Sequence, residues 1–132
     1  MLLAIDIGNT NIAVGVFDGD ELRATWRIAT DARRMADEYG VLMQELLGIK
    51  GLSAEEVDEA ALCSVVPPLT PAFTRLCQDH LSVHPLVVGE DTRTDIRVLY
   101  EPPRDVGADR IVDAVATRTL YGVPAINVDF GT

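Results

Sequence analysis

Lysine is almost absent from this sequence: Lys50 is the only lysine among 11 basic residues, against 21 acidic residues. The formal net charge of −10 disfavours binding to duplex nucleic acid, because that function needs a basic face. A phosphate site in this chain must therefore use backbone N–H groups, arginine or a metal ion rather than the lysine of a P-loop.

Long apolar runs and a cysteine framework are also missing. No segment approaches the roughly 18 apolar residues of a membrane span. The start, MLLAIDIG, has no basic region, and Asp6 interrupts its apolar run. Cys63 and Cys77 are too few for a secreted disulfide framework. We therefore expect reduced and buried cysteines, no secretion signal, no membrane association and a cytoplasmic location.

The composition is otherwise that of a globular protein. With 132 residues, 48% of them apolar and 24% charged, the chain is long enough for one domain, or for one domain and the start of another. Apolar runs at 2–7, 12–17 and 22–28 are separated by polar turns, one of them Asp18-Gly19-Asp20. This pattern predicts three antiparallel strands.

The apolar period then becomes that of alternating helices and strands. Apolar residues at helical spacing predict a helix over 39–47, ended by Gly48 and Gly51. The other predicted elements are a helical turn at 53–56, strands at 60–66, 85–88 and 125–130, a helix with Thr70 as N-cap and Pro71 as its first residue, a loop over 89–106 with a brief extension at 96–99, and a helix from 108 to about 121. The order βββαβαβα, with one extra strand, predicts an α/β fold with a mixed sheet and helices on its faces.

The turn between the first two strands has the chemistry of an anion site. Asp6-Ile7-Gly8-Asn9-Thr10-Asn11 combines a glycine that allows close backbone approach with polar donors and one carboxylate. Asp6 could hold a hydrated Mg²⁺ ion. A plain hairpin, in which Gly and Asn permit positive φ, explains the hexapeptide equally well.

Two further segments carry related chemistry. Asp129-Phe130-Gly131-Thr132 again puts Asp, Gly and Thr at the end of an apolar run. Gly107-Ala108-Asp109-Arg110 opens the third helix, whose N-terminus favours anions, and Arg110 suits a carboxylate. Asp109 and Asp113 share a helix face, although simple helix capping by Asp109 and a solvated Asp113 are alternatives.

Together these three segments resemble the type III pantothenate kinases of the acetate and sugar kinase/Hsc70/actin superfamily. Pro67 and Tyr100-Glu101-Pro102 fit the same family. The resemblance implies a ribonuclease H-like (actin-like ATPase) domain over 1–122, and it implies that 123–132 is the first strand of a truncated second domain.

The resemblance also implies an activity, namely ATP-dependent phosphorylation of pantothenate to 4'-phosphopantothenate in coenzyme A biosynthesis. It implies ATP with Mg²⁺, a monovalent cation (K⁺ or NH₄⁺), a homodimer, and Asp109 as catalytic base. The implied ATP or phosphate contacts are Asp6, Ile7, Gly8, Asn9, Thr10, Asn11, Ile12, Ala13 and Thr132. The implied pantothenate contacts are Tyr100, Gly107, Ala108, Asp109 and Arg110, and the implied metal ligands are Asp6 for Mg²⁺ and Asp129 for K⁺ or NH₄⁺.

Two other functions are compatible with the residues. One is a non-catalytic nucleotide-binding or regulatory module of the same fold, since fold alone does not decide function. The other is a different ribonuclease H-like kinase or phosphatase, although the Gly107–Arg110 segment argues against it. His80 and His84 have the spacing of helical metal ligands, but no third ligand is evident nearby and we expect no metal there.

Overall fold

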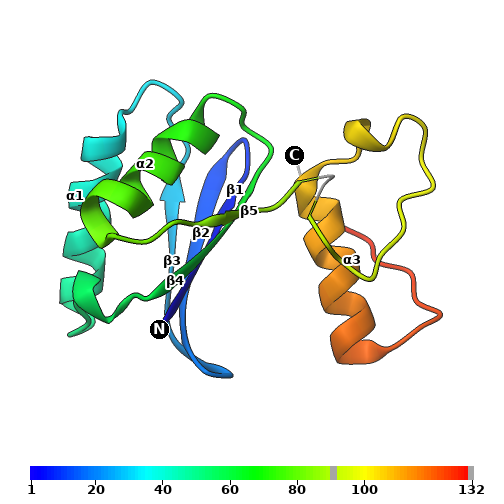
Figure 1. Ribbon diagram of the computed structural model, residues 1–132, viewed down its shortest axis with the longest axis horizontal. Helices are drawn as coiled ribbons and strands as arrows, with labels where there is room; N and C mark the ends of the chain where they lie inside the picture. The colour runs from blue at the N-terminus through cyan, green and yellow to red at the C-terminus, as the bar shows by residue number, and fades with distance from the viewer. Residues whose placement is uncertain (90–91, 131–132) are drawn as a thin grey trace.

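The structure, a computed structural model, describes residues 1–89 and 92–130. Its centre is a five-stranded sheet of β1 (Leu2–Ile7), β2 (Asn11–Asp18), β3 (Glu21–Ala29), β4 (Glu59–Ser64) and β5 (Leu86–Val87). The strand order is β3-β2-β1-β4-β5 (Figure 1). Because β1 pairs antiparallel with β2 and parallel with β4, the predicted mixed sheet is confirmed.

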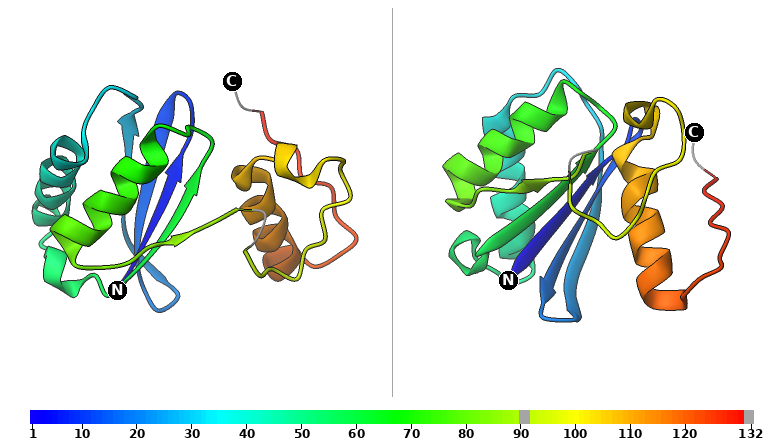
Figure 2. Two further views of the ribbon diagram at one scale, coloured as in Figure 1. Left: turned by 45° about the horizontal axis from the view of Figure 1, so that its top comes forward. Right: turned by 45° about the vertical axis from the view of Figure 1, so that its right-hand side comes forward.

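The helices lie on both sides of this sheet. They are α1 (Ala36–Ile49), α2 (Leu69–Leu81) and α3 (Ala108–Tyr121), with 3₁₀ turns η1 (Ala54–Glu56) and η2 (Pro103–Asp105). α1 and α2 lie together against one face, and α3 lies on the opposite side (Figure 1 and Figure 2). In the described ranges, none of the helices has the length and apolar character that crossing a membrane demands.

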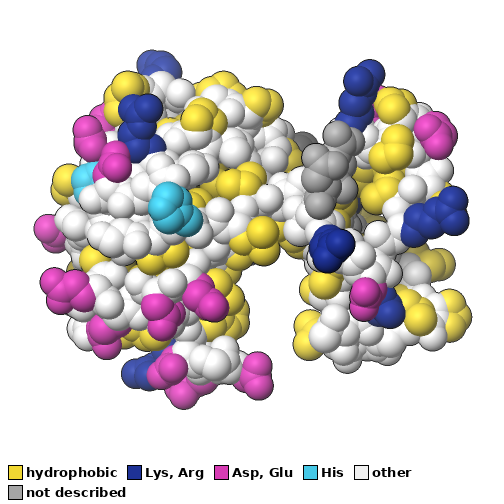
Figure 3. Space-filling view, viewed as in Figure 1, with side chains coloured by type: hydrophobic (Ala, Val, Ile, Leu, Met, Phe, Trp, Pro, Cys, Tyr) yellow, Lys and Arg dark blue, Asp and Glu magenta, His cyan; other side chains and the backbone are white. Residues whose placement is uncertain are grey.

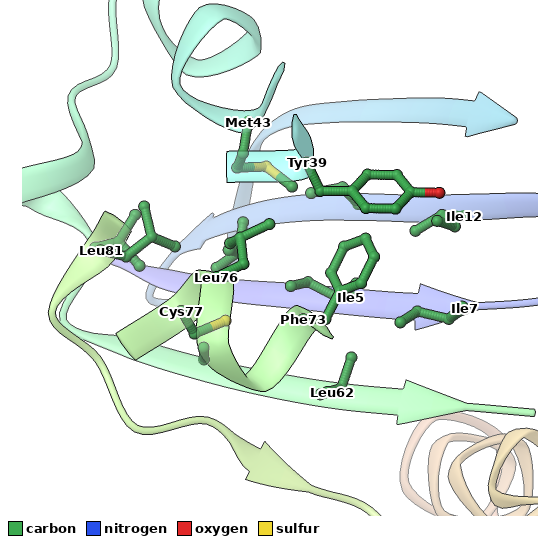
Figure 4. Packing of buried hydrophobic residues seen from close by; sticks show 14 of the residues in the cluster. Ile5, Ile7, Ile12, Tyr39, Met43, Leu62, Phe73, Leu76, Cys77 and Leu81 are labelled. Atoms are coloured by element: carbon green, nitrogen blue, oxygen red, sulfur yellow. The ribbon is translucent and has the colours of Figure 1, made fainter. Parts of the chain in front are cut away.

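One face of the sheet is closed by a packed core. Leu3, Ile5 and Ile7 alternate along β1 and are 0–2% exposed, because every second residue of a strand points to the same face. Tyr39 of α1 and Phe73 of α2 belong to the same core, with ring centroids 4.6 Å apart (Figure 4). Each large apolar side chain buried in this way contributes about 1.5–3 kcal/mol of stability.

Helices α1 and α2 approach each other closely at Gly40. A Cβ atom at this position would lie 2.5–2.6 Å from the ring of His80. His80 Nε2 in turn lies 3.0 Å from Asp37 Oδ1 of α1, while His84 Nδ1 lies 3.1 Å from the Gln78 amide. His80 of α2 therefore packs against Gly40 and contacts Asp37, both of α1.

The opposite face of the sheet is only partly covered. Ala4, Ala13, Gly15 and Phe17 line an apolar cavity of about 360 Å³, and Val112 of α3 contributes to its wall. The space-filling view shows apolar side chains along the hollow between the two parts of the molecule (Figure 3). The sheet thus has a closed face toward α1 and α2 and an open face toward α3.

Two predicted helix boundaries are wrong. α2 begins at Leu69 with Pro68 as N-cap, not at Pro71 with Thr70 as N-cap. Pro68 already has helical angles (φ −64°, ψ −26°), and Pro71 is tolerated in the first turn because N–H groups there lack helical partners. α1 continues past Gly48 to Ile49, and the residue beyond it with positive φ is Gly51.

The strand expected at 125–130 is also absent from the structure. Ile126 and Phe130 are 92% and 96% exposed, and the residues between them carry no strand pairing. A strand needs a neighbour to satisfy its backbone groups, and none of the described residues supplies one here. The extension expected at 96–99 likewise lacks strand pairing, and the 3₁₀ turn η2 lies within the loop expected over 89–106.

Candidate functional site

A polar cleft lies where the carboxyl ends of β1 and β4 meet the start of α3. Its volume is about 450 Å³. The residues that line it are Asp6, Gly8, Asn9, Thr10, Asn11, Val65, Asp109, Val112, Asp113, Asp129 and Phe130. The fold therefore brings described residues from each of the three segments singled out in the sequence to one cleft.

The β1–β2 turn is held in one conformation by backbone hydrogen bonds. The Gly8 N–H donates to Asn11 O at 3.0 Å, and the Thr30 N–H donates to Thr10 O at 3.0 Å. A Cβ at Gly8 would lie 3.1 Å from Asn11 O, so the tight turn favours glycine. No residue from 8 to 11, all of them described, has positive φ, and the hairpin explanation based on positive φ therefore does not apply.

Asp6 lines the cleft and lies beside Cys63. The two residues are partners in the parallel β1–β4 register and lie on the open face of the sheet. Asp6 stays accessible to solvent, but partial burial raises the pKa of its carboxyl. A hydrogen bond with the Cys63 side chain lowers the Asp6 pKa, and the charges of Asp109, Asp113 and Asp129 raise it further.

Both cysteines are free and buried, as predicted. Burial and the neighbouring Asp6 carboxylate raise the pKa of Cys63 to about 12, and burial raises the pKa of Cys77 to about 11. Both thiols are therefore protonated near neutral pH, and Cys63 acts as a hydrogen-bond donor rather than as a nucleophile.

Four carboxylates face the cleft, from Asp6, Asp109, Asp113 and Asp129. Among the described residues, no three Asp, Glu, His or Cys side chains are close enough to ligate one ion together. Mg²⁺ fits such a cleft, because it commonly takes one or two carboxylates and completes its shell with water and substrate phosphates.

The start of α3 presents Asp109 to the cleft. Asp109 Oδ1 accepts a hydrogen bond from the Arg110 N–H at 2.8 Å. Gly107 is the N-cap residue, and a Cβ there would collide with Asp109 Oδ1 and contact Val65. The glycine therefore leaves the space that the Asp109 carboxylate occupies. Ala108 is buried at 9% exposure, so its side chain packs rather than binds.

Several residues expected at the site lie elsewhere. The side chains of Ile7 and Ile12 are fully buried in the core, so only their backbone can reach a ligand. Ala13 lines the apolar cavity instead of the polar cleft. Arg110 and Tyr100 are exposed and do not line the cleft, and Thr132 lies outside the described residues.

Sequence reasoning also missed residues that shape the cleft. Cys63 could be found only from the β1–β4 register, which a single sequence does not reveal. Thr30 follows β3 directly, and its contact with the β1–β2 turn depends on the pairing of β2 with β3. Asp113, expected to be a solvated carboxylate, is half-buried in the cleft wall, and its spacing from Asp109 was the available signal.

The fold is shared with solved structures of low sequence identity. A structure described as the PilM-PilN type IV pilus biogenesis complex aligns with 93% of this chain and 46% of its own, at a TM-score of 0.59 and 16% identity. A ROK hexokinase from Thermus thermophilus aligns with 65% of this chain and 33% of its own, at a TM-score of 0.48 and 19% identity. The strand order, the helices and the first of these likenesses define a ribonuclease H-like α/β domain, as the family resemblance implied.

Sequence comparison identifies a more specific group of proteins than the fold does. The family model for type III pantothenate kinase matches residues 2–132, and the chain belongs to this family. A protein of Moorella thermoacetica named type III pantothenate kinase is 50% identical over all 132 residues. Those residues span 52% of that relative, so the chain covers about half of its length.

Proposed function

We propose that the protein carrying this chain transfers the γ-phosphoryl group of ATP to the primary hydroxyl of pantothenate. The product is 4'-phosphopantothenate, in the first step of coenzyme A biosynthesis. The observation that carries the proposal is the cleft that joins Asp6, the turn 8–11 and Asp109. Membership of the family and the name of the Moorella thermoacetica relative support the same reaction.

In this proposal the β1–β2 turn and Asp6 receive the phosphate end of ATP. Backbone N–H groups of the turn suit phosphate oxygens in a chain with little lysine. Asp6 would hold Mg²⁺, which supplies charge neutralisation for the phosphates when bound. Ile7, Ile12 and Ala13 take part through their backbone, and Thr132 would contact a phosphate from the other side.

Asp109 is the proposed general base. Phosphoryl transfer depends chiefly on positioning and charge neutralisation. The carboxylate at the start of α3 would accept a hydrogen bond from the substrate hydroxyl, orient its oxygen and take its proton late in the reaction. The Gly107 position and the Arg110 N–H hold this carboxylate in the cleft.

The proposed pantothenate contacts rest on the family resemblance. The exposed guanidinium of Arg110 is chemically suited to the pantothenate carboxylate. Tyr100, which is 61% exposed, would lie along the substrate, next to backbone atoms of Gly107 and Ala108. Asp129 would be the ligand of a monovalent cation, K⁺ or NH₄⁺.

We further propose a second domain, a homodimer and a cytoplasmic location. Residues 1–122 would form the first domain, and 123–132 would begin the next. Supporting this, Ile126, Val128 and Phe130 alternate along the chain and are 64–96% exposed. Such a row of exposed apolar side chains is what a strand shows when its sheet partners are not beside it.

The test is formation of 4'-phosphopantothenate from pantothenate, ATP, Mg²⁺ and K⁺, followed by mass spectrometry. The variant Asp109→Asn keeps the side-chain shape and should lower turnover by about 10²–10⁴-fold. Asp79→Asn, on the exposed side of α2, is the matched control and should leave turnover unchanged. Turnover by Asp109→Asn within tenfold of the unsubstituted protein would contradict the base assignment.

The alternative is a non-catalytic nucleotide-binding module. It is favoured by one observation, that the side chains of Tyr100 and Arg110, the proposed pantothenate contacts, do not line the cleft. A folded chain that binds Mg²⁺-ATP but yields no phosphopantothenate would support this alternative for the 132-residue polypeptide.

A further inference from the structure

Thr30 joins the end of β3 to the β1–β2 turn by two hydrogen bonds. Its hydroxyl donates to Gly8 O at 2.7 Å, and its backbone N–H donates to Thr10 O at 3.0 Å. The side chain is half-buried. One residue therefore holds two points of the turn, 22 positions away from Gly8 along the chain.

These bonds matter because carbonyl oxygens repel phosphate. The carbonyl groups of residues 7, 8, 10 and 11 each accept a hydrogen bond within the protein, from the N–H of Val65, the Thr30 hydroxyl, the N–H of Thr30 and the N–H of Gly8. A carbonyl engaged in this way directs electron density to a protein donor instead of toward a bound anion. Two of the four bonds come from Thr30.

Thr30 is itself fixed through the next residue. The Asp31 N–H donates to the Tyr39 hydroxyl at 3.0 Å, and that hydroxyl donates to Asp31 O at 3.1 Å. Tyr39 is 1% exposed, and its ring packs on Phe73 (Figure 4). Thr30 is thus anchored to the closed core through Asp31 and Tyr39, and its own hydrogen bonds fix the turn relative to that core.

We propose that Thr30 is a positioning residue for phosphate binding, which holds the Gly8 and Thr10 carbonyls away from the anion and fixes the conformation of the turn 8–11. The inference rests on the proposed function, because it assigns the turn to the phosphates of ATP. Thr30 touches the turn and acts through it.

Thr30→Val tests this, because valine keeps the shape and removes the hydroxyl donor. Loss of one neutral hydrogen bond should weaken Mg²⁺-ATP binding by about 3- to 10-fold in titration calorimetry. Amide hydrogen exchange at residues 8–11 should accelerate in the absence of nucleotide. Thr30→Ser, which restores the donor, should return both readouts toward those of the unsubstituted protein.

Thr74→Val is the matched control. Thr74 is another half-buried threonine, and its hydroxyl donates to Thr70 O at 2.9 Å within α2, apart from the cleft residues. The same chemical change there should leave ATP affinity and exchange at 8–11 unaltered. A similar loss of ATP affinity in both valine variants would mean that the Thr30 effect reflects general stability. That result would overturn the proposal.

The outcomes separate this inference from the proposed function. Faster exchange at 8–11 with unchanged ATP affinity would overturn the role of Thr30 and leave the kinase proposal intact. Unchanged exchange would overturn it too, because the turn would then not depend on the hydroxyl. Failure of the unsubstituted protein to bind Mg²⁺-ATP would reject the phosphate site itself, and with it both proposals.

Discussion

The two faces of the central sheet differ in how tightly they are packed and in the side chains that they present. Toward α1 and α2, large side chains such as Leu62 and Phe73 are fully buried in one continuous core. Toward α3, small residues such as Ala4 and Gly15 leave an open cavity, and a polar cleft lies where β1 meets α3. The contrast teaches that the fold is stabilised on one side of β1, while the groups suited to chemistry gather on the other.

The largest difference in stability is expected between alanine variants of two phenylalanines, one on each face of the sheet. Phe73→Ala removes a fully buried ring and should lower the free energy of unfolding by about 3–5 kcal/mol. Phe17→Ala, on the half-covered open face, should cost about 1 kcal/mol. Urea denaturation of both variants measures the difference. Equal losses would mean that the open face is packed as tightly as the closed one.

A smaller effect, of opposite sign at two sites, is expected for glycines within α1. Gly40→Ala forces a methyl group against the His80 ring and should destabilise the protein by about 1–3 kcal/mol. Gly48→Ala has no atom within 4 Å of the new methyl group and should stabilise the helix by about 0.5–1 kcal/mol. Thermal melting distinguishes them, and destabilisation by both would show that helix packing at Gly40 is not the cause.

The smallest effect concerns the dependence of protein stability on pH that Asp6 causes. Its pKa is raised above 3.8 in the folded protein, so its stabilising contribution is complete below that pH and is lost as pH rises through the folded value. Asp6→Asn should therefore melt higher than the unsubstituted protein near neutral pH, and the difference should vanish below pH 3.8. Asp79→Asn is the control, and a gain independent of pH would contradict the explanation.

The closed face could be predicted from the sequence because its signals are local. The apolar run over 2–7 and the helical stripe over 39–47 can be recognised within short segments, and the structure confirms both elements. The three cleft segments were also recognisable, since each carries its Asp, Gly or Thr within a few positions. Local chemistry singled out Asp6 and Asp109 but left a plain hairpin and simple helix capping as alternatives, and only the family resemblance implied a role for each.

The contacts between segments could not be predicted in the same way. The neighbour of Asp6 is Cys63 because β4 pairs with β1 in one register, and a shift of one residue would turn Cys63 to the other face. The failed strand at 125–130 has a related cause. The alternation of apolar residues favours a strand, as at Ile126, Val128 and Phe130. A strand also needs a neighbouring strand with which to form backbone hydrogen bonds.

The backbone bonds of the β1–β2 turn have a consequence for mutagenesis. An N–H group remains when a side chain is replaced, so alanine scanning across residues 9–11 would leave every backbone donor of the turn in place. Such a scan would underestimate the contribution of the turn to ATP binding, even if those backbone N–H groups formed every contact with the phosphates. Replacement of single amides by esters, which deletes an N–H without changing the side chain, is the substitution able to map them.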